Sequence, residues 1–103
     1  MLLKRFDETS ILRAAVEYYG ADAQQKMLLE EMSELQKEIC KWWRGQDNVQ
    51  KIAEEIADVL IVIDQMLIIF DCSAMMQSYR AGKIERLRER MIEAWVEKAE
   101  EMA

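Results

Sequence analysis

The chain of 103 residues is long enough for one domain with a modest core, and it is 51% hydrophobic and 33% charged. Its net charge of −6 argues against binding to nucleic acid or to an anionic membrane, because both surfaces repel an acidic protein. Histidine is absent from the sequence, which excludes mechanisms with a histidine base and argues against the usual zinc sites.

Helical periodicity dominates the sequence, which has no proline and three glycines. Apolar residues recur at helical spacing through residues 9–19, which predicts a first helix that ends at Gly20. The side chains that could cap this helix are Asp7, Thr9 and Ser10. A second helix is predicted over residues 22–43, with Gly45 as its C-cap. Its apolar stripe consists of Leu28, Met32, Leu35, Ile39 and Trp42.

Two further helices follow. Asp47 or Asn48 is the expected N-cap of a third helix that reaches Phe70. Ser73 is the expected N-cap of a fourth helix that extends to Glu100. Because the turns are short, the second and third helices must be antiparallel neighbours.

These elements predict an all-α fold, a four-helix bundle that forms a single domain over residues 1–103. The third helix is apolar nearly all round from Ile56 to Phe70, and four short helices cannot easily enclose such a helix. We therefore expect a homodimer or a dimer of dimers with this helix near the interface.

The longest uncharged apolar run, from Val59 to Ile63, is too short to span a membrane, so we expect no membrane partner. The two cysteines, Cys40 and Cys72, are expected to be free core thiols in a reducing compartment. Both features favour a soluble protein of the cytoplasm.

Four carboxylates form two pairs at helical spacing. Glu31 and Glu34 are three residues apart in the second predicted helix, and Glu55 and Asp58 are three apart in the third. Each pair presents its oxygens to one side of its helix. Apolar residues surround Glu55 at helical spacing, so its carboxylate is expected on an apolar face. An unpaired buried carboxylate costs several kcal/mol, and a proton, a basic partner or a metal ion removes that cost.

A metal site is the leading interpretation of these acids. An ordinary solvated flank is the alternative for Glu31, Glu34 and Glu38, and Lys51 could neutralise one acid. Four acids that face one another across two helices need more positive charge than that. Oxygen ligands without histidine or cysteine select Mg²⁺, Mn²⁺ or Ca²⁺.

At these residues the sequence resembles the MazG-type all-α nucleoside triphosphate pyrophosphohydrolases, whose signature joins Glu-Glu-x-x-Glu to Glu-x-x-Asp. In this chain the signature residues are Glu30, Glu31, Glu34, Glu55 and Asp58, with twenty residues between the two halves. The resemblance covers about residues 14–92, in a single copy without the second domain of larger members. It implies a MazG-like bundle in which the antiparallel second and third helices carry the acidic site.

The resemblance also implies an activity, the hydrolysis of a nucleoside triphosphate between its α and β phosphates. The products are the monophosphate and pyrophosphate, and the role is the cleaning of the nucleotide pool. It implies Mg²⁺, or Mn²⁺, held by Glu31, Glu34, Glu55 and Asp58. Glu34 or Glu38 could accept the proton of the attacking water.

Cations for the phosphates are expected on the fourth helix, where Lys83, Arg86 and Arg90 share one face. A solvated basic face that pairs with neighbouring glutamates is the alternative. A second set of candidates ends the second helix and consists of Lys41 and Arg44 for the phosphates and of Trp42 or Trp43 for stacking on the base.

Two other classes of protein stay open at this point. One is a non-catalytic, oligomeric helical interaction module that retains the fold, and the other is a metal-binding protein without turnover. The acid pairs favour the enzyme, because a purely structural bundle gains nothing from acids on an apolar face.

Overall fold

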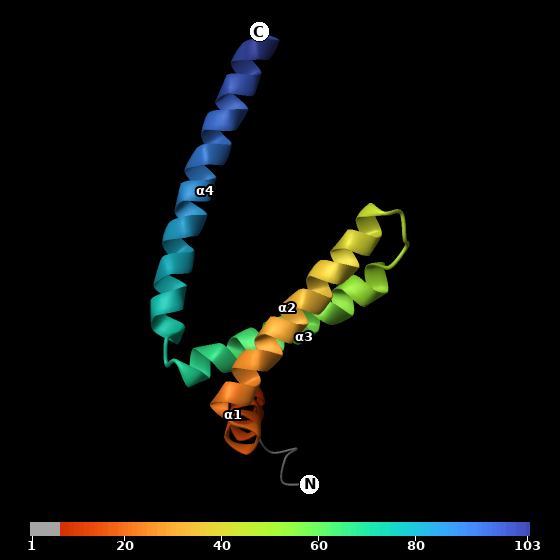
Figure 1. Ribbon diagram of the computed structural model, residues 1–103. Helices are drawn as coiled ribbons and strands as arrows, with labels where there is room; N and C mark the ends of the chain where they lie inside the picture. The colour runs from red at the N-terminus through yellow and green to blue at the C-terminus, as the bar shows by residue number, and fades with distance from the viewer. Residues whose placement is uncertain (1–6) are drawn as a thin grey trace. The chain divides into compact units, whose positions relative to one another are not determined.

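The computed structural model describes residues 7–103 (Figure 1). They form four helices, α1 (Glu8–Tyr19), α2 (Ala21–Trp43), α3 (Val49–Ile69) and α4 (Ser73–Met102), and no strand occurs within this range. The predicted all-helical class and its four helices are confirmed. Over the same range, no helix combines the length and the apolar composition needed to cross a membrane.

The chain divides into two compact units. The first extends to Asp71 and contains α1, α2 and α3, and the second, Cys72–Ala103, contains α4. Within the first unit α2 and α3 lie side by side as an antiparallel hairpin, as predicted, and α1 packs against both (Figure 1). The hairpin brings the two acidic segments of the sequence together.

Local sequence signals set the ends of α1 and α2. The Asp7 carboxylate caps α1 by accepting a hydrogen bond of 2.8 Å from the backbone N–H three residues later. Gly45 follows α2 with a φ of 96°, in the left-handed region that glycine adopts without a steric penalty. Its N–H donates to the carbonyl of Trp42, and the N–H of Gln46 donates to the carbonyl of Lys41. These two bonds form a Schellman motif, which turns the chain back toward α3.

The predicted N-cap of α4 is wrong, whereas that of α3 is right in position and lacks only the side-chain bond. Ser73 is the first residue of α4, and its N-cap is Cys72. The preceding Asp71 has a φ of 47°, which aspartate tolerates in turns better than most side chains do. Asn48 does occupy the N-cap of α3, but its side chain makes no capping bond and reaches α2 instead.

Polar side chains take up most of the buried positions of the hairpin. Among the residues that the structure describes, Val59 and Val62 are the two buried apolar side chains. The buried polar residues are Gln24, Glu38, Glu55 and Gln65, all on α2 and α3. Members of the apolar stripe of α2, such as Met32, are exposed. The prediction of core thiols is wrong for Cys40, which is exposed, although both cysteines are free.

The far side of α3 carries an apolar stripe that α1 and α2 leave uncovered. Ile56, Leu60 and Ile63 recur at helical spacing and are between 38% and 56% exposed. We call these three residues the α3 stripe. An exposed apolar stripe of this kind is a candidate contact surface.

Candidate metal centre

Polar side chains of α2 and α3 form three layers, which we call the polar seam. Its members are Gln24, Glu31 and Glu38 on α2 and Gln65, Asp58 and Lys51 on α3. On both helices the members are seven residues apart, about two helical turns or ~10 Å. Because the helices are antiparallel, residue numbers rise along α2 where they fall along α3, so each member on α2 has a counterpart on α3. The three layers are therefore Gln24 with Gln65, Glu31 with Asp58, and Glu38 with Lys51.

The first layer satisfies its own hydrogen-bonding groups. The Gln24 Nε2 group donates a hydrogen bond of 2.8 Å to Gln65 Oε1. Both residues are buried, at 8% and 3% exposed. A paired amide layer needs no ligand to offset its burial.

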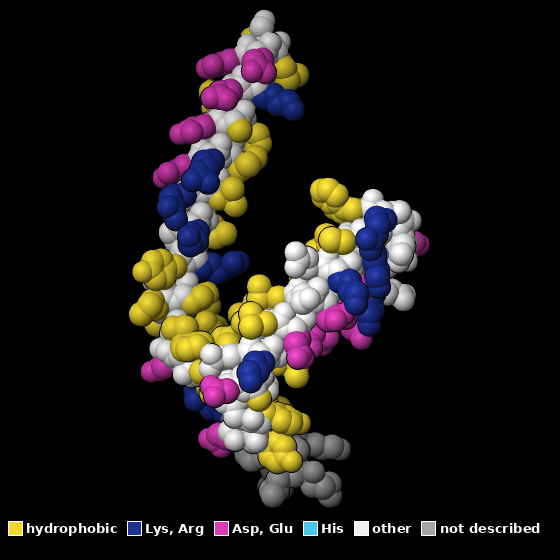
Figure 2. All heavy atoms as spheres, in the orientation of Figure 1, with side chains coloured by type: hydrophobic (Ala, Val, Ile, Leu, Met, Phe, Trp, Pro, Cys, Tyr) yellow, Lys and Arg dark blue, Asp and Glu magenta, His cyan; other side chains and the backbone are white. Residues whose placement is uncertain are grey.

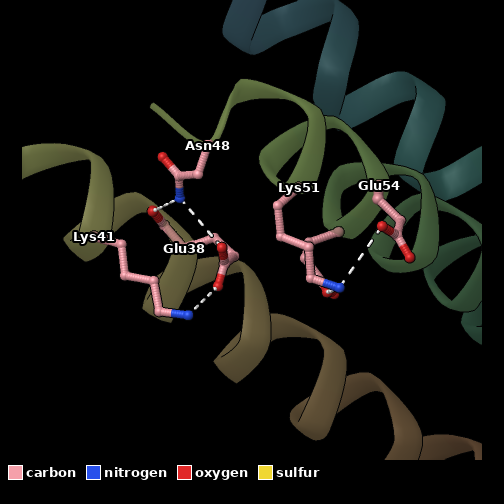
Figure 3. A network of polar contacts seen from close by, with 6 residues as sticks. Glu38, Lys41, Asn48, Lys51 and Glu54 are labelled. Carbon is pink, nitrogen blue, oxygen red and sulfur yellow. Dashed lines mark hydrogen bonds and ion pairs between the residues drawn. The ribbon is translucent and has the colours of Figure 1, made fainter. Parts of the chain in front are cut away.

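The third layer is also paired, at the end of the hairpin that carries the turn (Figure 3). The Glu38 carboxylate forms an ion pair of 2.9 Å with Lys41 Nζ and accepts a hydrogen bond of 3.2 Å from Asn48 Nδ2. Asn48 Nδ2 also donates to the Glu38 carbonyl at 2.9 Å, while Asn48 Oδ1 is buried without a partner among the described residues. The hydrogen bonds from Lys41 and Asn48, with the positive charge of Lys51, hold the pKa of Glu38 below its ordinary value.

The middle layer differs, because carboxylates face carboxylates. Glu31 of α2 meets Asp58 of α3, and Glu55 lies beside them. One oxygen from each of the three residues lies within 4.8 Å of the others. Glu55 is only 6% exposed, and the other two residues are half-buried. We call these three residues the acidic cluster.

The acidic cluster is electrostatically unfavourable without a cation. Burial raises the pKa of Glu31 above its ordinary value, and the negative charges of Asp58, Glu55, Glu34 and Glu30 raise it further, in that order. Both effects favour the neutral form of the carboxyl group. A bound divalent cation would reverse them, because it stabilises the ionised form.

Lys51 offsets this charge in part (Figure 3). Its Nζ lies 3.6 Å from an oxygen of Glu55 and 3.6 Å from an oxygen of Glu54. Both carboxylates raise the pKa of Lys51, Glu54 more than Glu55. Within the described part of the chain it is the one cation paired with the acidic cluster, and it is shared with a fourth acid. Three carboxylates are therefore left with less than one full positive charge.

The geometry of the acidic cluster fits a hard divalent cation. Octahedral Mg²⁺ binds oxygens at about 2.1 Å, so opposite ligands are about 4.2 Å apart, and Ca²⁺ accepts about 5 Å. One oxygen from each of the three residues lies within 4.8 Å of the others, a separation at the scale of these coordination shells. The donor set holds oxygen alone, which is the chemistry that these cations prefer.

The other predicted residues of the acidic segments lie around this cluster. Glu34 is exposed on α2, outside the three-residue group but near enough to raise the pKa of Glu31. Glu38 belongs to the third layer and not to the acidic cluster.

The predicted phosphate-binding and base-stacking residues fall into two sets. Lys41 is engaged by Glu38, whereas Arg44 and Trp43 are exposed where α2 ends. The basic residues Lys83, Arg86 and Arg90 belong to the second unit and are exposed on α4.

Sequence reasoning missed the polar residues that flank the acidic cluster. Gln24 and Gln65 carry no catalytic signature, and Asn48 was expected to cap a helix. The seven-residue spacing from Glu31 and Asp58 is a signal that could have found the two glutamines.

Comparison of the chain with family models, with curated proteins and with solved structures finds no match.

Proposed function

We propose that this protein is a Mg²⁺-dependent nucleoside triphosphate pyrophosphohydrolase, which converts a (d)NTP to the (d)NMP and pyrophosphate. The observation that carries the proposal is the middle layer of the polar seam. The layers on either side of it are paired within the chain, whereas only Glu55 of the three carboxylates has a cationic partner among the described residues, Lys51, which it shares with Glu54. A divalent cation is the simplest partner for such a layer.

The order and spacing of the acids support the same activity. The three residues of the acidic cluster are those that the MazG-type signature assigns to the metal, with Glu34 as the fourth. We extend the proposal to a MazG-like helical arrangement, to Mg²⁺ or Mn²⁺ as the cation, and to nucleotide-pool cleaning in the cytoplasm.

Each residue then has a distinct role. The acidic cluster would hold the cation, and bound Mg²⁺ supplies neutralising charge for the triphosphate and acidifies a water molecule at the site. Glu34 would complete the ligands or accept the proton of the attacking water, since its carboxylate is exposed beside the cluster. We favour Glu34 over Glu38 as the base, because the Glu38 carboxylate is already bonded to Lys41 and Asn48.

Phosphate contacts would come from exposed cations. Arg44 is one candidate, with Trp43 beside it for the base, and the basic residues of α4 are the other. The α3 stripe favours a homodimer or a dimer of dimers, in which a second copy covers the apolar surface.

A product assay tests the proposal. The purified protein is incubated with a panel of dNTPs and NTPs in Mg²⁺, and pyrophosphate and orthophosphate are measured separately. We expect pyrophosphate and the monophosphate in equal amounts from at least one substrate. Release of orthophosphate alone would refute cleavage between the α and β phosphates.

The second candidate is a non-catalytic helical interaction module, which the large exposed apolar surface favours. A protein that binds metal without turnover is the third. Absence of any product in the assay, combined with tight Mn²⁺ binding, would select the third. Absence of both would select the interaction module.

A further inference from the structure

Charge is divided along α4. Residues 80–90 carry five basic and two acidic side chains, a net charge of +3, and residues 91–101 carry one basic and four acidic side chains, a net charge of −3. Figure 2 shows the dark blue basic side chains in the middle of α4 and the magenta acidic ones toward its C-terminus. We call these segments the basic half and the acidic half of α4.

An apolar stripe crosses the boundary between the two halves. Ile84, Leu87, Met91 and Trp95 follow one another at intervals of three, four and four residues, so they lie on one face of α4. We call these four residues the α4 stripe, and all four are exposed. A helix that forms a unit by itself gains most of its stability from what its apolar face packs against.

We propose that two copies of this chain associate through their α4 helices as an antiparallel pair. In this orientation the basic half of each helix lies beside the acidic half of the other, at both ends of the pair. A parallel pair would place like charges side by side along the whole contact, which is unfavourable. The pairing is isologous, so one two-fold axis satisfies both copies.

The α4 stripe and the division of charge predict the same alignment of the two α4 helices. The α4 stripe runs from Ile84 to Trp95, so its midpoint falls between residues 89 and 90. The net charge changes sign after Arg90, within one residue of that midpoint. A two-fold axis at this point places Ile84 opposite Trp95 of the partner subunit and overlays the halves of opposite sign.

The pairing rests on α4 alone and does not depend on the proposed activity. It would engage the basic half that the sequence also offers to substrate phosphates. For Lys83, Arg86 and Arg90 the two uses therefore compete.

Distances between spin labels in the full chain test the orientation. Cys40 and Cys72 are replaced by serine, and a label is attached at Arg88→Cys in one variant and at Gln77→Cys in another. The Arg88→Cys labels should lie close together, since residue 88 is near the axis and borders the α4 stripe on the helix surface. The Gln77→Cys labels should be about 38 Å apart along the helix axis, from the rise of 1.5 Å per residue over 25 residues. Short distances at both positions would indicate a parallel pair and overturn the proposal, as would a monomer or the lack of a short distance at Arg88→Cys.

Charge reversal tests the complementarity. Glu97→Lys with Glu100→Lys makes both halves of α4 basic, and Arg80→Glu with Lys83→Glu makes both halves acidic. Each double variant should self-associate through α4 roughly tenfold more weakly than the natural chain. A mixture of the two should restore the short distance at Arg88→Cys, because an all-basic helix then pairs with an all-acidic one.

A matched control applies the same charge change elsewhere. Glu17→Lys with Asp22→Lys alters exposed residues of α1 and α2 and should leave the α4 distances and the association unchanged. Circular dichroism confirms that each variant stays helical. Association that is equal in all variants, or insensitive to salt, would overturn the charge argument.

Discussion

Burial and like charge act together on Glu31. Because its pKa in the folded state lies above the ordinary value of 4.5, the ionised group destabilises the fold when no cation is bound. The contribution of Glu31 to the free energy of unfolding is fully present below pH 4.5, where the carboxyl group is protonated. This contribution is lost as the pH rises through the raised pKa. Glu38 has the opposite sign, since its pKa is lowered and its contribution is lost as the pH falls.

A pH series follows from this difference. Without divalent cations, Glu31→Gln should gain stability relative to the natural chain as the pH rises from 4.5 to 7. Urea unfolding at several pH values in a chelator measures the change. Glu38→Gln serves as the reference of opposite sign: its stability deficit relative to the natural chain should stay nearly constant from pH 4.5 to 7 and should shrink as the pH falls below 4.5. A difference for Glu31→Gln that does not vary with pH would contradict the electrostatic account of the acidic cluster.

Glu55 and Glu54 can be compared directly. A carboxylate oxygen of each lies 3.6 Å from Lys51 Nζ, but only Glu55 is buried in the acidic cluster. Glu55→Gln should abolish turnover and divalent binding and leave the metal-free fold as stable as before, or slightly more so. In the natural chain, Mn²⁺ at 100 times its Kd should stabilise the fold by about 2.7 kcal/mol.

Glu54→Gln is the matched control, and it should keep both the Mn²⁺ stabilisation and the turnover. Thermal unfolding with and without Mn²⁺, together with the pyrophosphate assay, provides the readouts. Equal losses in the two variants would mean that the total charge around Lys51 matters and the cluster geometry does not.

Glu34 and Glu38 should separate catalysis from stability. Glu38→Ala removes the acceptor of Lys41 and one of the two acceptors of Asn48 Nδ2, so the free energy of unfolding should fall by about 1–3 kcal/mol. Glu34→Ala removes an exposed group and should change stability by less than about 0.5 kcal/mol while turnover is lost. Urea titration and initial rates measure the two effects. The reverse pattern would make Glu38 the base.

At the scale of the helices, the seven-residue repeat of the polar seam sets how α2 and α3 align. A shift of one helix along the other would separate the Gln24–Gln65 pair and pull Glu38 away from Asn48 at the same time. Paired polar layers specify register in helix pairs at little gain in stability. In this protein the two paired layers keep the acidic oxygens of α2 and α3 at the same level along the helix axes.

The glutamine layer offers a test of that role. Gln65→Leu alone leaves the buried Gln24 amide without its hydrogen-bond partner. The free energy of unfolding should fall by about 1–3 kcal/mol. Replacement of both glutamines by leucine should be nearly neutral for stability, because no buried polar group is left unpaired. The double variant should nevertheless bind Mn²⁺ several-fold more weakly, as the register then depends on one layer. Unchanged Mn²⁺ affinity by calorimetry would show that the turn suffices to align the helices.

At the scale of the whole molecule, the balance of burial points to association. Val59 and Val62 are the two buried apolar side chains of the described chain, whereas the conformational entropy of ordering a residue opposes folding by about 1–2 kcal/mol each. The α3 stripe and the α4 stripe together hold the apolar area that could offset this cost. In the proposed oligomer, a second copy of the chain covers each of them.

The α3 stripe gives a prediction for the oligomer. Leu60→Glu places a charge in its centre and should weaken association through the α3 stripe at least tenfold, since a leucine that becomes buried in an interface contributes about 1.5–3 kcal/mol. Light scattering after size exclusion measures the mass over a range of concentrations. Gln50→Glu adds the same charge at an exposed position outside the stripe and should leave the mass unchanged. A natural chain that runs as a 12.2 kDa monomer would refute the oligomer.

The sequence by itself determined the helices and the place of the acids on each of them. Periodicity, Gly20, Gly45 and the Asp7 cap act within a few residues, so local patterns suffice to predict the four helices. The i, i+3 spacing likewise determines that each acid pair shares a side of its helix.

The tertiary structure alone decided which acids meet. Glu31 joins Glu55 and Asp58, while Glu34 stays exposed and Glu38 turns to Lys41 in a separate layer. This outcome depends on the rotation of α2 and on its position along α3. Those two quantities are set by contacts between residues distant in sequence, such as Gln24 and Gln65, and no local pattern contains them.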